Sequence, residues 1–314
     1  MENNMRHKFL AVAILFTAFT AGATATNQRT AQAPANMLVQ TSWLAAHLSD
    51  KNLVILHVGA NRAGYDAGHI PGARFLALSE IAVRRDGIPY NLPETKDLQT
   101  TFERLGVGNN SHVVLYGDMF NLFALRAYIE LDYLGHGSNV SLLDGGLEKW
   151  AREHGTVRTT PEDIVPGVLT VHPNAALIIQ FPEVRKAVSN KDIDLVDARS
   201  PTEYVGTNAG YGGARNGHIP GAKNVFWAEN LESETNPVFK PASEIHAMYL
   251  AAGIKPGDKV IVYCQGGIHA AYDYFTLKLT GFHPVLYVGS FGEWSNEFNA
   301  PVETGRGGAG RSSF

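Results

Sequence analysis

The sequence has a single cysteine, Cys264, in 314 residues. One cysteine excludes an intramolecular disulfide framework and any zinc or iron–sulfur site that needs several thiolates. Basic residues are too few and too scattered to neutralise a phosphate backbone, because 26 Lys and Arg stand against 30 Asp and Glu, a formal charge of −4. Nucleic acid is therefore not an expected partner. With 45% hydrophobic and 18% charged residues, the chain should fold into one large or two ordinary domains.

The apolar run near the start is too short to span a membrane. Residues 9–19 cover only about half of a ~30 Å hydrocarbon core at roughly 1.5 Å per residue. Basic residues precede the run and small residues follow it, up to an Ala-Thr-Ala triplet at 23–25, which is typical of an export signal rather than a membrane anchor. We interpret residues 1–25 as a signal peptide, with cleavage after Ala25 or Ala33. The mature protein is predicted to be periplasmic or secreted, with no stable membrane insertion.

Three sequence segments occur twice, in the same order. The first, GHIPGAR at 68–74, returns as GHIPGAK at 217–223. The other two pairs are VVLY at 113–116 with VIVY at 260–263, and DGGLEKW at 144–150 with VGSFGEW at 288–294. Because the spacing between copies is far longer than the repeat of a solenoid, the chain is predicted to hold two copies of one domain.

Each copy alternates β-branched runs with amphipathic stretches, which predicts an α/β fold with a parallel sheet flanked by helices. The first domain is predicted at 36–155 and the second at 175–303, with a linker at 156–174 that contains Pro and Gly and a flexible tail at 304–314. The predicted helices cover 42–48, 96–105, 122–134, 182–188, 243–252 and 270–279. The predicted strands cover 53–58, 113–116, 140–143, 193–197, 260–264 and 285–288.

The strand of the second copy that ends at Cys264 leads into a glycine-rich loop, which ends at His269 before the next helix. Open α/β sheets bind ligands at the carboxyl ends of their strands. Two consecutive glycines, Gly266 and Gly267, allow several N–H groups to point inward, and the helix start adds positive potential. Such a cradle stabilises a thiolate, and it would equally accept the anionic sulfur of a substrate.

A buried core cysteine is the alternative interpretation of Cys264. The glycine context and the solitary thiol of an exported chain favour a functional cysteine. The first copy has Gly117 at the aligned position and so carries no nucleophile. A phosphatase loop would need an arginine six positions after the cysteine, where Ala270 stands, and no acid-oriented histidine can be placed beside Cys264 for a Cys–His hydrolase.

Taken together, these motifs resemble the tandem-domain rhodaneses, which are thiosulfate and 3-mercaptopyruvate sulfurtransferases. The likeness runs from about residue 42 to residue 301. It rests on the two HIPGA turns, on VDARSPTEY at 196–204, on Cys264 with its six-residue loop at the end of a strand, and on GEW at 292–294. In that family the amino-terminal copy has lost its cysteine and the carboxyl-terminal copy carries the persulfide, which is the asymmetry of this sequence.

The resemblance implies two rhodanese-like domains and a sulfur transfer from thiosulfate to cyanide or a thiol through a Cys264 persulfide, without metal or organic cofactor. The partners are then a small anionic sulfur donor and a thiol or cyanide acceptor. A 3-mercaptopyruvate sulfurtransferase, or a persulfide carrier with little turnover of its own, are the alternatives. The implied substrate-binding residues are Gln265, Gly266, Gly267, Ile268, His269 and Arg215, and the supporting residues are Asp197 and Arg199.

Departures from the family pattern concern the choice of donor. Thiosulfate-type loops usually carry basic residues after the cysteine, whereas this loop offers Gln265 and His269. His269 would supply a hydrogen bond or, when protonated, a charge. Mercaptopyruvate-type loops usually have serine where Gly266 stands, so thiosulfate is favoured. One substrate-side arginine of the family is replaced by Glu203, while Arg215 matches another, although an isolated arginine in a polar loop is often simply solvated.

Other conspicuous residues receive structural interpretations. His69 and His218 precede the two Ile-Pro-Gly turns, and because the turn also occurs in the copy without cysteine, we expect hydrogen-bonding roles for both. Asp197 and Arg199 follow a strand and are expected to form an ion pair, which either shapes the site or is purely structural. The tryptophans at 150, 227 and 294 are expected in the core or at an interface.

Overall fold

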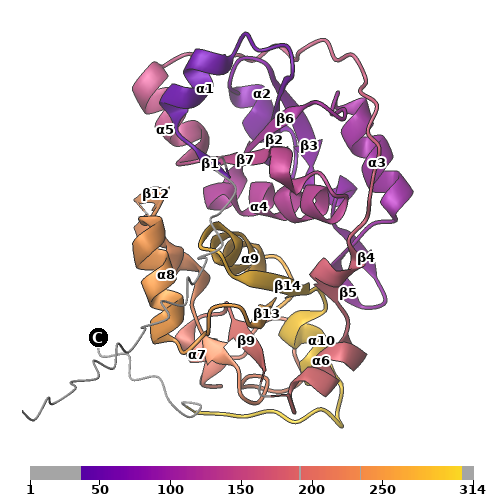
Figure 1. Ribbon diagram of the computed structural model, residues 1–314, viewed down its shortest axis with the longest axis vertical. Helices are drawn as coiled ribbons and strands as arrows, with labels where there is room; N and C mark the ends of the chain where they lie inside the picture. The colour runs from indigo at the N-terminus through magenta and orange to yellow at the C-terminus, as the bar shows by residue number, and fades with distance from the viewer. Residues whose placement is uncertain (1–36, 191, 234, 306–314) are drawn as a thin grey trace, which may run out of the picture. The chain divides into compact units, whose positions relative to one another are not determined.

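The computed structural model describes residues 37–190, 192–233 and 235–305 (Figure 1). The predicted signal peptide, both of its cleavage sites and residues 306–314 of the predicted tail lie outside the described residues. Among the helices of the described part, none combines the length and the apolar character that crossing a bilayer requires.

Two five-stranded parallel sheets form the framework, as the alternating pattern predicted. The first has the strand order β1-β7-β6-β2-β3 and the second the order β10-β9-β13-β14-β8, which is the same order read from the other edge. The strands of the first sheet are β1 Leu38–Val39, β2 Leu53–Gly59, β3 Ala73–Ala77, β6 His112–Gly117 and β7 Val140–Leu143. Those of the second are β8 Ile178–Ile179, β9 Ile193–Asp197, β10 Lys223–Asn224, β13 Lys259–Tyr263 and β14 His283–Tyr287.

The strand register confirms the duplication at the level of single residues. In the second sheet Tyr263 of β13 pairs with Asp197 of β9, and in the first sheet Tyr116 of β6 pairs with His57 of β2. The next residue along each central strand is Cys264 in one copy and Gly117 in the other. Gly117 is therefore the structural counterpart of Cys264, as the sequence alignment of the copies predicted.

Helices cover the faces of both sheets, and two antiparallel hairpins project from the domains (Figure 1). Each predicted helix and strand is present with its ends within two residues, apart from the start of the helix predicted from residue 122. The helices are α1 Thr41–His47, α2 Ala63–Ala67, α3 Thr95–Arg104, α4 Asp118–Tyr133, α5 Gly146–His154, α6 Phe181–Ala187, α7 Pro201–Tyr204, α8 Ala242–Ala251, α9 Ala270–Leu279 and α10 Ser290–Asn296. The hairpin strands are β4 Val83–Arg85 with β5 Ile88–Asn91, and β11 Leu231–Ser233 with β12 Asn236–Phe239.

Helix α4 begins four residues earlier than predicted, and these extra residues form an irregular first turn. Residues 119–121 have positive φ angles of 52°, 59° and 68°, and regular helix follows from Leu122. Asn121 tolerates this left-handed conformation, and its side-chain oxygen accepts a hydrogen bond from the Gly117 amide at 2.9 Å. The turn after β6 is thus built differently from the turn that follows Cys264.

Helices α4 and α9 pack against each other and join the two domains into one hydrophobic core. Apolar side chains from both sheets belong to this core, and α4 is buried on almost every side. Asp132 of α4 accepts hydrogen bonds from the Tyr274 hydroxyl, at 2.7 Å, and from the Lys278 ammonium of α9. Such paired burial of charges fixes the register of the two helices because an unpaired buried charge is costly.

Asp273 of α9 is a fully buried carboxyl that has no basic partner in hydrogen-bond range among the described residues. One of its oxygens accepts hydrogen bonds from Asn230 and from the Tyr249 hydroxyl, each at 2.8 Å, and the other has no partner among the described residues. Burial raises the pKa of Asp273 from about 3.8 to about 7. The folded state therefore binds a proton that the unfolded state has already lost between these two pH values.

We predict that replacing Asp273 by Asn makes the free energy of unfolding less dependent on pH. A raised carboxyl pKa lowers the stability of the wild type as pH rises from about 4 to about 7, and the amide has no charge to gain. The Asp273→Asn variant should therefore gain stability relative to the wild type between pH 5 and pH 8, measured by urea unfolding. A stability difference that stays constant over this range would contradict the assignment.

Candidate active site

Cys264 lies at the carboxyl end of the central strand of the second sheet. It follows Tyr263, the last residue of β13, and precedes a loop that leads to Ala270, the first residue of α9. Asp197 ends the neighbouring strand β9 at the same edge of the sheet. The nucleophile predicted from the sequence is therefore placed where parallel sheets bind their ligands.

The start of α10 holds the main chain of the cysteine loop. The Cys264 amide donates a hydrogen bond to the Ser290 hydroxyl at 3.2 Å, and the Phe291 amide donates to the Cys264 carbonyl at 2.9 Å. The Gly292 amide donates to the Gln265 carbonyl at 2.8 Å. These three bonds connect the ends of β13 and β14, so the loop is anchored on both sides.

One main-chain amide of the described residues is hydrogen-bonded to the cysteine sulfur. The Gly267 N–H donates to Cys264 Sγ at 3.1 Å. Gly267 has a φ angle of 91°, and a side chain there would lie 2.5 Å from the Val288 carbonyl oxygen. Only glycine fits this position without displacing backbone, and the resulting curl turns the amide toward the sulfur.

The Cys264 side chain is fully buried, so in this conformation the loop does not expose its sulfur to small anions. Its exposed fraction is 0%, and it belongs to the hydrophobic core. Tyr211 and Pro89 cover the loop: a methyl group at Gly266 would lie 2.9 Å from the Tyr211 hydroxyl oxygen and 3.1 Å from Pro89 Cγ. In this conformation a donor meets the sulfur only after side chains around the loop have moved.

Tyr211 is close enough to Cys264 for the two groups to interact electrostatically. Although 55% of Tyr211 is exposed, its hydroxyl is shielded, and this burial is the first cause that raises the pKa of Tyr211. The electrostatic interaction with Cys264 raises it further. Tyr211 belongs to no motif of the sequence, and the only signal for its segment is the set of glycines at 206, 210, 212 and 213, which leave the backbone unusually free.

A cavity of about 380 Å³ adjoins the cover and is lined by both domains. The turn between β4 and β5 contributes one wall, and Tyr211, Gln265 and α10 contribute the others. Its charged lining residues are Arg84, Asp86, Glu293 and Glu297. The mouth of the cavity therefore carries more acidic than basic groups.

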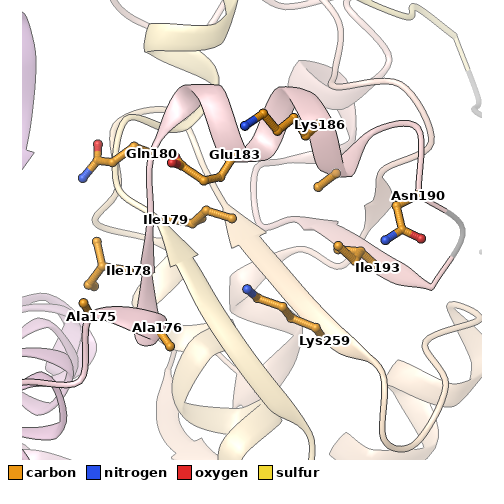
Figure 2. Close-up of a pocket in the computed structure, with 11 residues that line it drawn as sticks. Ala175, Ala176, Ile178, Ile179, Gln180, Glu183, Lys186, Asn190, Ile193 and Lys259 are labelled. Atoms are coloured by element: carbon orange, nitrogen blue, oxygen red, sulfur yellow. The ribbon is translucent and has the colours of Figure 1, made fainter.

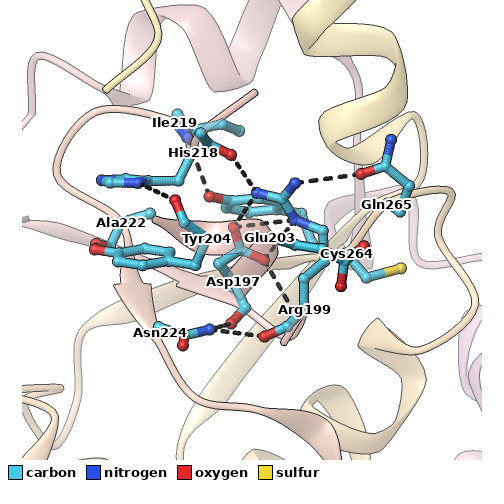
Figure 3. A network of polar contacts seen from close by, with 12 residues as sticks. Asp197, Arg199, Glu203, Tyr204, His218, Ile219, Ala222, Asn224, Cys264 and Gln265 are labelled. Atoms are coloured by element: carbon cyan, nitrogen blue, oxygen red, sulfur yellow. Dashed lines mark hydrogen bonds and ion pairs between the residues drawn. The ribbon is translucent and has the colours of Figure 1, made fainter. Parts of the chain in front are cut away.

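Asp197 and Arg199 form the predicted ion pair, seen in Figure 3. Their closest atoms, Oδ2 and Nη2, are 2.5 Å apart, and Arg199 also donates to the Gly217 carbonyl at 2.7 Å and to the Gln265 side-chain oxygen at 3.2 Å. Burial alone lowers the pKa of Arg199, but the Asp197 carboxylate outweighs it, so the net pKa is raised. Figure 3 shows the Cys264 sulfur directed away from this pair, which therefore supports the loop and does not touch the sulfur.

The remaining predicted loop residues are held by protein contacts. Gln265 donates from its side-chain nitrogen to the Tyr211 carbonyl at 2.7 Å, and Ile268 is packed in the core. His269 stacks on Trp227 with ring centroids 5.3 Å apart. Burial lowers the pKa of His269, so the imidazole is neutral at pH 7 and supplies no full charge to a donor. Substrate contacts by these residues stay predictions.

Arg215 is occupied by the end of α10. Its guanidinium donates to the main-chain carbonyls of Trp294, Ser295, Glu297 and Ala300. None of its described hydrogen bonds points to the cysteine loop, so the predicted substrate contact has no supporting geometry. Glu203 forms a capping box with Ser200 at the start of α7 and is likewise used in the fold.

The two histidines of the HIPG turns have equivalent structural positions, as predicted. Nδ1 of His69 lies 2.8 Å from the Tyr65 carbonyl oxygen, and Nδ1 of His218 lies 2.8 Å from the Tyr204 carbonyl oxygen. Each imidazole stacks on the ring of that tyrosine at 3.8 Å. Of the tryptophans, those at 150 and 294 are buried in the core and the one at 227 covers His269.

The first domain keeps a small cavity at the equivalent place but cannot accommodate the nucleophile. A side chain at Gly117 would lie 2.3 Å from the Val58 carbonyl oxygen, so a cysteine does not fit without moving the backbone. The cavity measures about 200 Å³ and is lined by His57 and Asp118, whose Nε2 and Oδ1 atoms are 3.0 Å apart. Burial lowers the pKa of His57 despite this carboxylate.

A larger cavity of about 490 Å³ lies at the opposite end of the second sheet (Figure 2). Ile193 and Lys259, the first residues of β9 and β13, line it together with Glu183, Lys186 and Ala187 of α6. Cys264 follows Lys259 by five positions along β13, a length of about 16 Å at roughly 3.3 Å per residue. This cavity has no part in the chemistry at the cysteine.

The sequence matches the model of the rhodanese-like domain twice, at residues 40–153 and 181–297. It is 34% identical to the sulfur carrier protein TtuD of Thermus thermophilus, over 86% of this chain and 97% of the relative. It is 32% identical to a probable 3-mercaptopyruvate sulfurtransferase of Pseudomonas aeruginosa (85% and 98%) and 33% identical to a thiosulfate sulfurtransferase of Corynebacterium glutamicum (85% and 90%).

Solved structures share the arrangement of both domains. SseA from Escherichia coli, described as a 3-mercaptopyruvate sulfotransferase, superposes with a TM-score of 0.72 at 27% identity, over 81% of this chain and 98% of SseA. An EanB variant in complex with hercynine superposes with a TM-score of 0.77 at 26% identity, over 86% of this chain and 70% of EanB.

We predict that Tyr211→Ala speeds the reaction of Cys264 with iodoacetamide severalfold. Removing the ring and hydroxyl opens the cover above Gly266, and less local opening is then needed to expose the sulfur. Tyr211→Phe keeps the ring and serves as the control, with a rate near that of the wild type. Equal alkylation rates in the Ala variant and the wild type would show that Tyr211 does not limit access.

Proposed function

The chain belongs to the rhodanese family of sulfurtransferases, with the rhodanese-like domain present twice, and we propose on that premise that it transfers sulfane sulfur from thiosulfate to cyanide or a thiol through a persulfide on Cys264. The observation that carries this proposal is the Gly267 amide placed 3.1 Å from Cys264 Sγ, at the carboxyl end of the central strand. No second thiol of the chain can take the sulfur.

The proposed reaction has two steps. The Cys264 thiolate attacks the outer sulfur of thiosulfate, the S–S bond of the donor breaks, and sulfite leaves with the bonding electron pair. The persulfide anion that remains then gives its outer sulfur to cyanide or a thiolate, and the Cys264 thiolate is regenerated. Charge balances in both steps, since one thiolate and one dianion give one persulfide anion and one sulfite dianion.

The chain supplies electrostatic stabilisation and a dry environment. The Gly267 amide donates to the sulfur that carries negative charge before and after the first step, in the way that main-chain amides stabilise an oxyanion. The Asp197–Arg199 pair holds Gln265, and through it the Tyr211 segment, against the loop. Burial of Cys264 excludes water from the persulfide and so protects it between the two steps.

Thiosulfate is proposed over 3-mercaptopyruvate because Gly266 stands where the mercaptopyruvate enzymes usually have serine, so the loop has no hydroxyl there for a keto acid. A compact donor also requires less displacement of Tyr211 and Pro89 than a longer one. Relatives named for each donor resemble this chain to similar extents.

A persulfide carrier is the second candidate function. Two observations favour it: the sulfur is fully buried in this conformation, and the cavity lined by Tyr211 and Gln265 has three acidic lining residues against one arginine. Acidic groups at the mouth repel a dianionic donor and slow its entry. A relative with 34% identity is named a sulfur carrier protein.

Export of the protein is proposed from the leader alone. We predict that a host with a secretory pathway releases a mature protein that begins at residue 26 or 34, as read by intact mass and amino-terminal sequencing of the soluble fraction. Retention of Met1 in a membrane-bound product would contradict cleavage.

We predict that thiosulfate adds about 32 Da, roughly one sulfur atom, to the wild-type protein and nothing to Cys264→Ser. Thiocyanate release from thiosulfate and cyanide should fall to background in the variant because no other thiol can carry the sulfur. Parallel assays with 3-mercaptopyruvate identify the preferred donor. Sulfur loading with thiocyanate release near background would favour the carrier, and full turnover by Cys264→Ser would refute the persulfide mechanism.

A further inference from the structure

A buried arginine of the first domain contacts the cysteine loop of the second. Arg126 lies on α4, and its exposed fraction is 0%. Its Nη1 donates a hydrogen bond at 3.1 Å to the carbonyl oxygen of Gly267, and its Nε donates at 2.7 Å to the equally buried carboxylate of Glu130. Arg126 thus links the domain without cysteine to the residue whose amide contacts the sulfur.

Gly267 is held by contacts in two directions. Its amide donates to Cys264 Sγ, and its carbonyl accepts from Arg126. A glycine has no side chain to restrict its φ and ψ angles, so at a φ of 91° external contacts must keep it in place. Without the hydrogen bond to the carbonyl, rotation of the flanking peptides would carry the amide away from the sulfur.

The cost of burying Arg126 argues against a purely packing role. A buried ion pair is often no more stable than apolar side chains of similar volume, because two charges must be desolvated. Among the described residues, Nη2 of Arg126 and Oε2 of Glu130 have no hydrogen-bond partner, so the pair leaves two buried polar atoms without a hydrogen bond. Because burying Arg126 in this way costs stability, we expect the arginine to have a function besides packing. Its hydrogen bond to the Gly267 carbonyl is a contact that could provide this function.

We propose that Arg126 is a positioning residue for sulfur transfer, contributed by the domain that lacks the cysteine: it holds the Gly267 carbonyl and thereby keeps the Gly267 amide on the sulfur. This inference rests on the proposed function of Cys264 and deepens it. Glu130 orients the guanidinium through Nε, and the carboxyl-terminal domain alone would hold an incomplete loop. The duplicated domain therefore retains a role in the reaction although it has no nucleophile.

The test compares Arg126→Met with Lys278→Met. Lys278 also forms a partly buried contact between α9 and α4, through Asp132, but its side chain contacts no residue of the loop in the described hydrogen bonds. It therefore controls for damage to the domain interface. Two readouts are taken from pH 5.5 to 9.5: the rate at which iodoacetamide alkylates Cys264, and the rate of sulfur loading from thiosulfate in a single turnover.

We expect Arg126→Met to move the midpoint of the alkylation profile to higher pH by about one unit. A shift of this size leaves about tenfold less thiolate at pH 7, but a more basic thiolate is also more nucleophilic. The alkylation rate at pH 7 should therefore fall only about threefold. Sulfur loading should slow in the same way, and in steady-state assays kcat should fall more than KM rises. Arg126→Lys should be intermediate, and Lys278→Met should match the wild type.

Wild-type pH midpoints in Arg126→Met, or an equal shift in Lys278→Met, would overturn the proposal. If Arg126→Met does not fold, Arg126→Lys and Glu130→Gln carry the test, and wild-type midpoints in both would overturn it. Alkylation needs no sulfur donor. A wild type that alkylates normally but takes no sulfur from thiosulfate or 3-mercaptopyruvate would therefore refute the proposed function, while the alkylation midpoints would still decide on Arg126.

Discussion

The hydrogen bond from the Gly267 amide to the Cys264 sulfur is the contact that the surrounding structure maintains. The strand β13 brings the sulfur to the edge of the sheet, and the amides at the start of α10 hold the carbonyls of the loop. Arg126 reaches the same glycine from the other domain. Main-chain amides are suited to this task because they carry partial positive charge without a counterion and cannot be titrated.

Burial of the sulfur restricts access to it and would protect the proposed persulfide. A fully buried Cys264 is shielded from water and oxidants, which suits a reactive intermediate that waits for its acceptor. Because the sulfur is buried, we expect the segment around Tyr211 to move when a donor enters. The glycines of this segment lower the free energy of such a local opening. Access to the sulfur thus depends on the Tyr211 segment at Gly266, whereas stabilisation of the sulfur depends on the Gly267 amide.

The sequence predicted those features that depend on local pattern. The duplication, the central strands, Cys264 and the pairing of Asp197 with Arg199 follow from short motifs and their spacing. The two-residue strands β1, β8 and β10 were not predicted, because they exist through pairing with β7, β14 and β9, which are distant in the sequence. Tyr211 and Arg126 were missed for the same reason, since Arg126 and Gly267 are 141 positions apart. Arg215 was expected at the substrate because of its neighbouring motif, but packing directs its guanidinium to the carbonyls that end α10.

The role of the Gly267 amide can be examined in a crystal structure of the protein after treatment with thiosulfate. We expect an additional sulfur atom, visible in anomalous difference density, bonded to Cys264 Sγ and within hydrogen-bond distance of main-chain amides of residues 265–269. An unmodified Cys264, or an outer sulfur that points into apolar side chains while the Gly267 amide faces elsewhere, would contradict it.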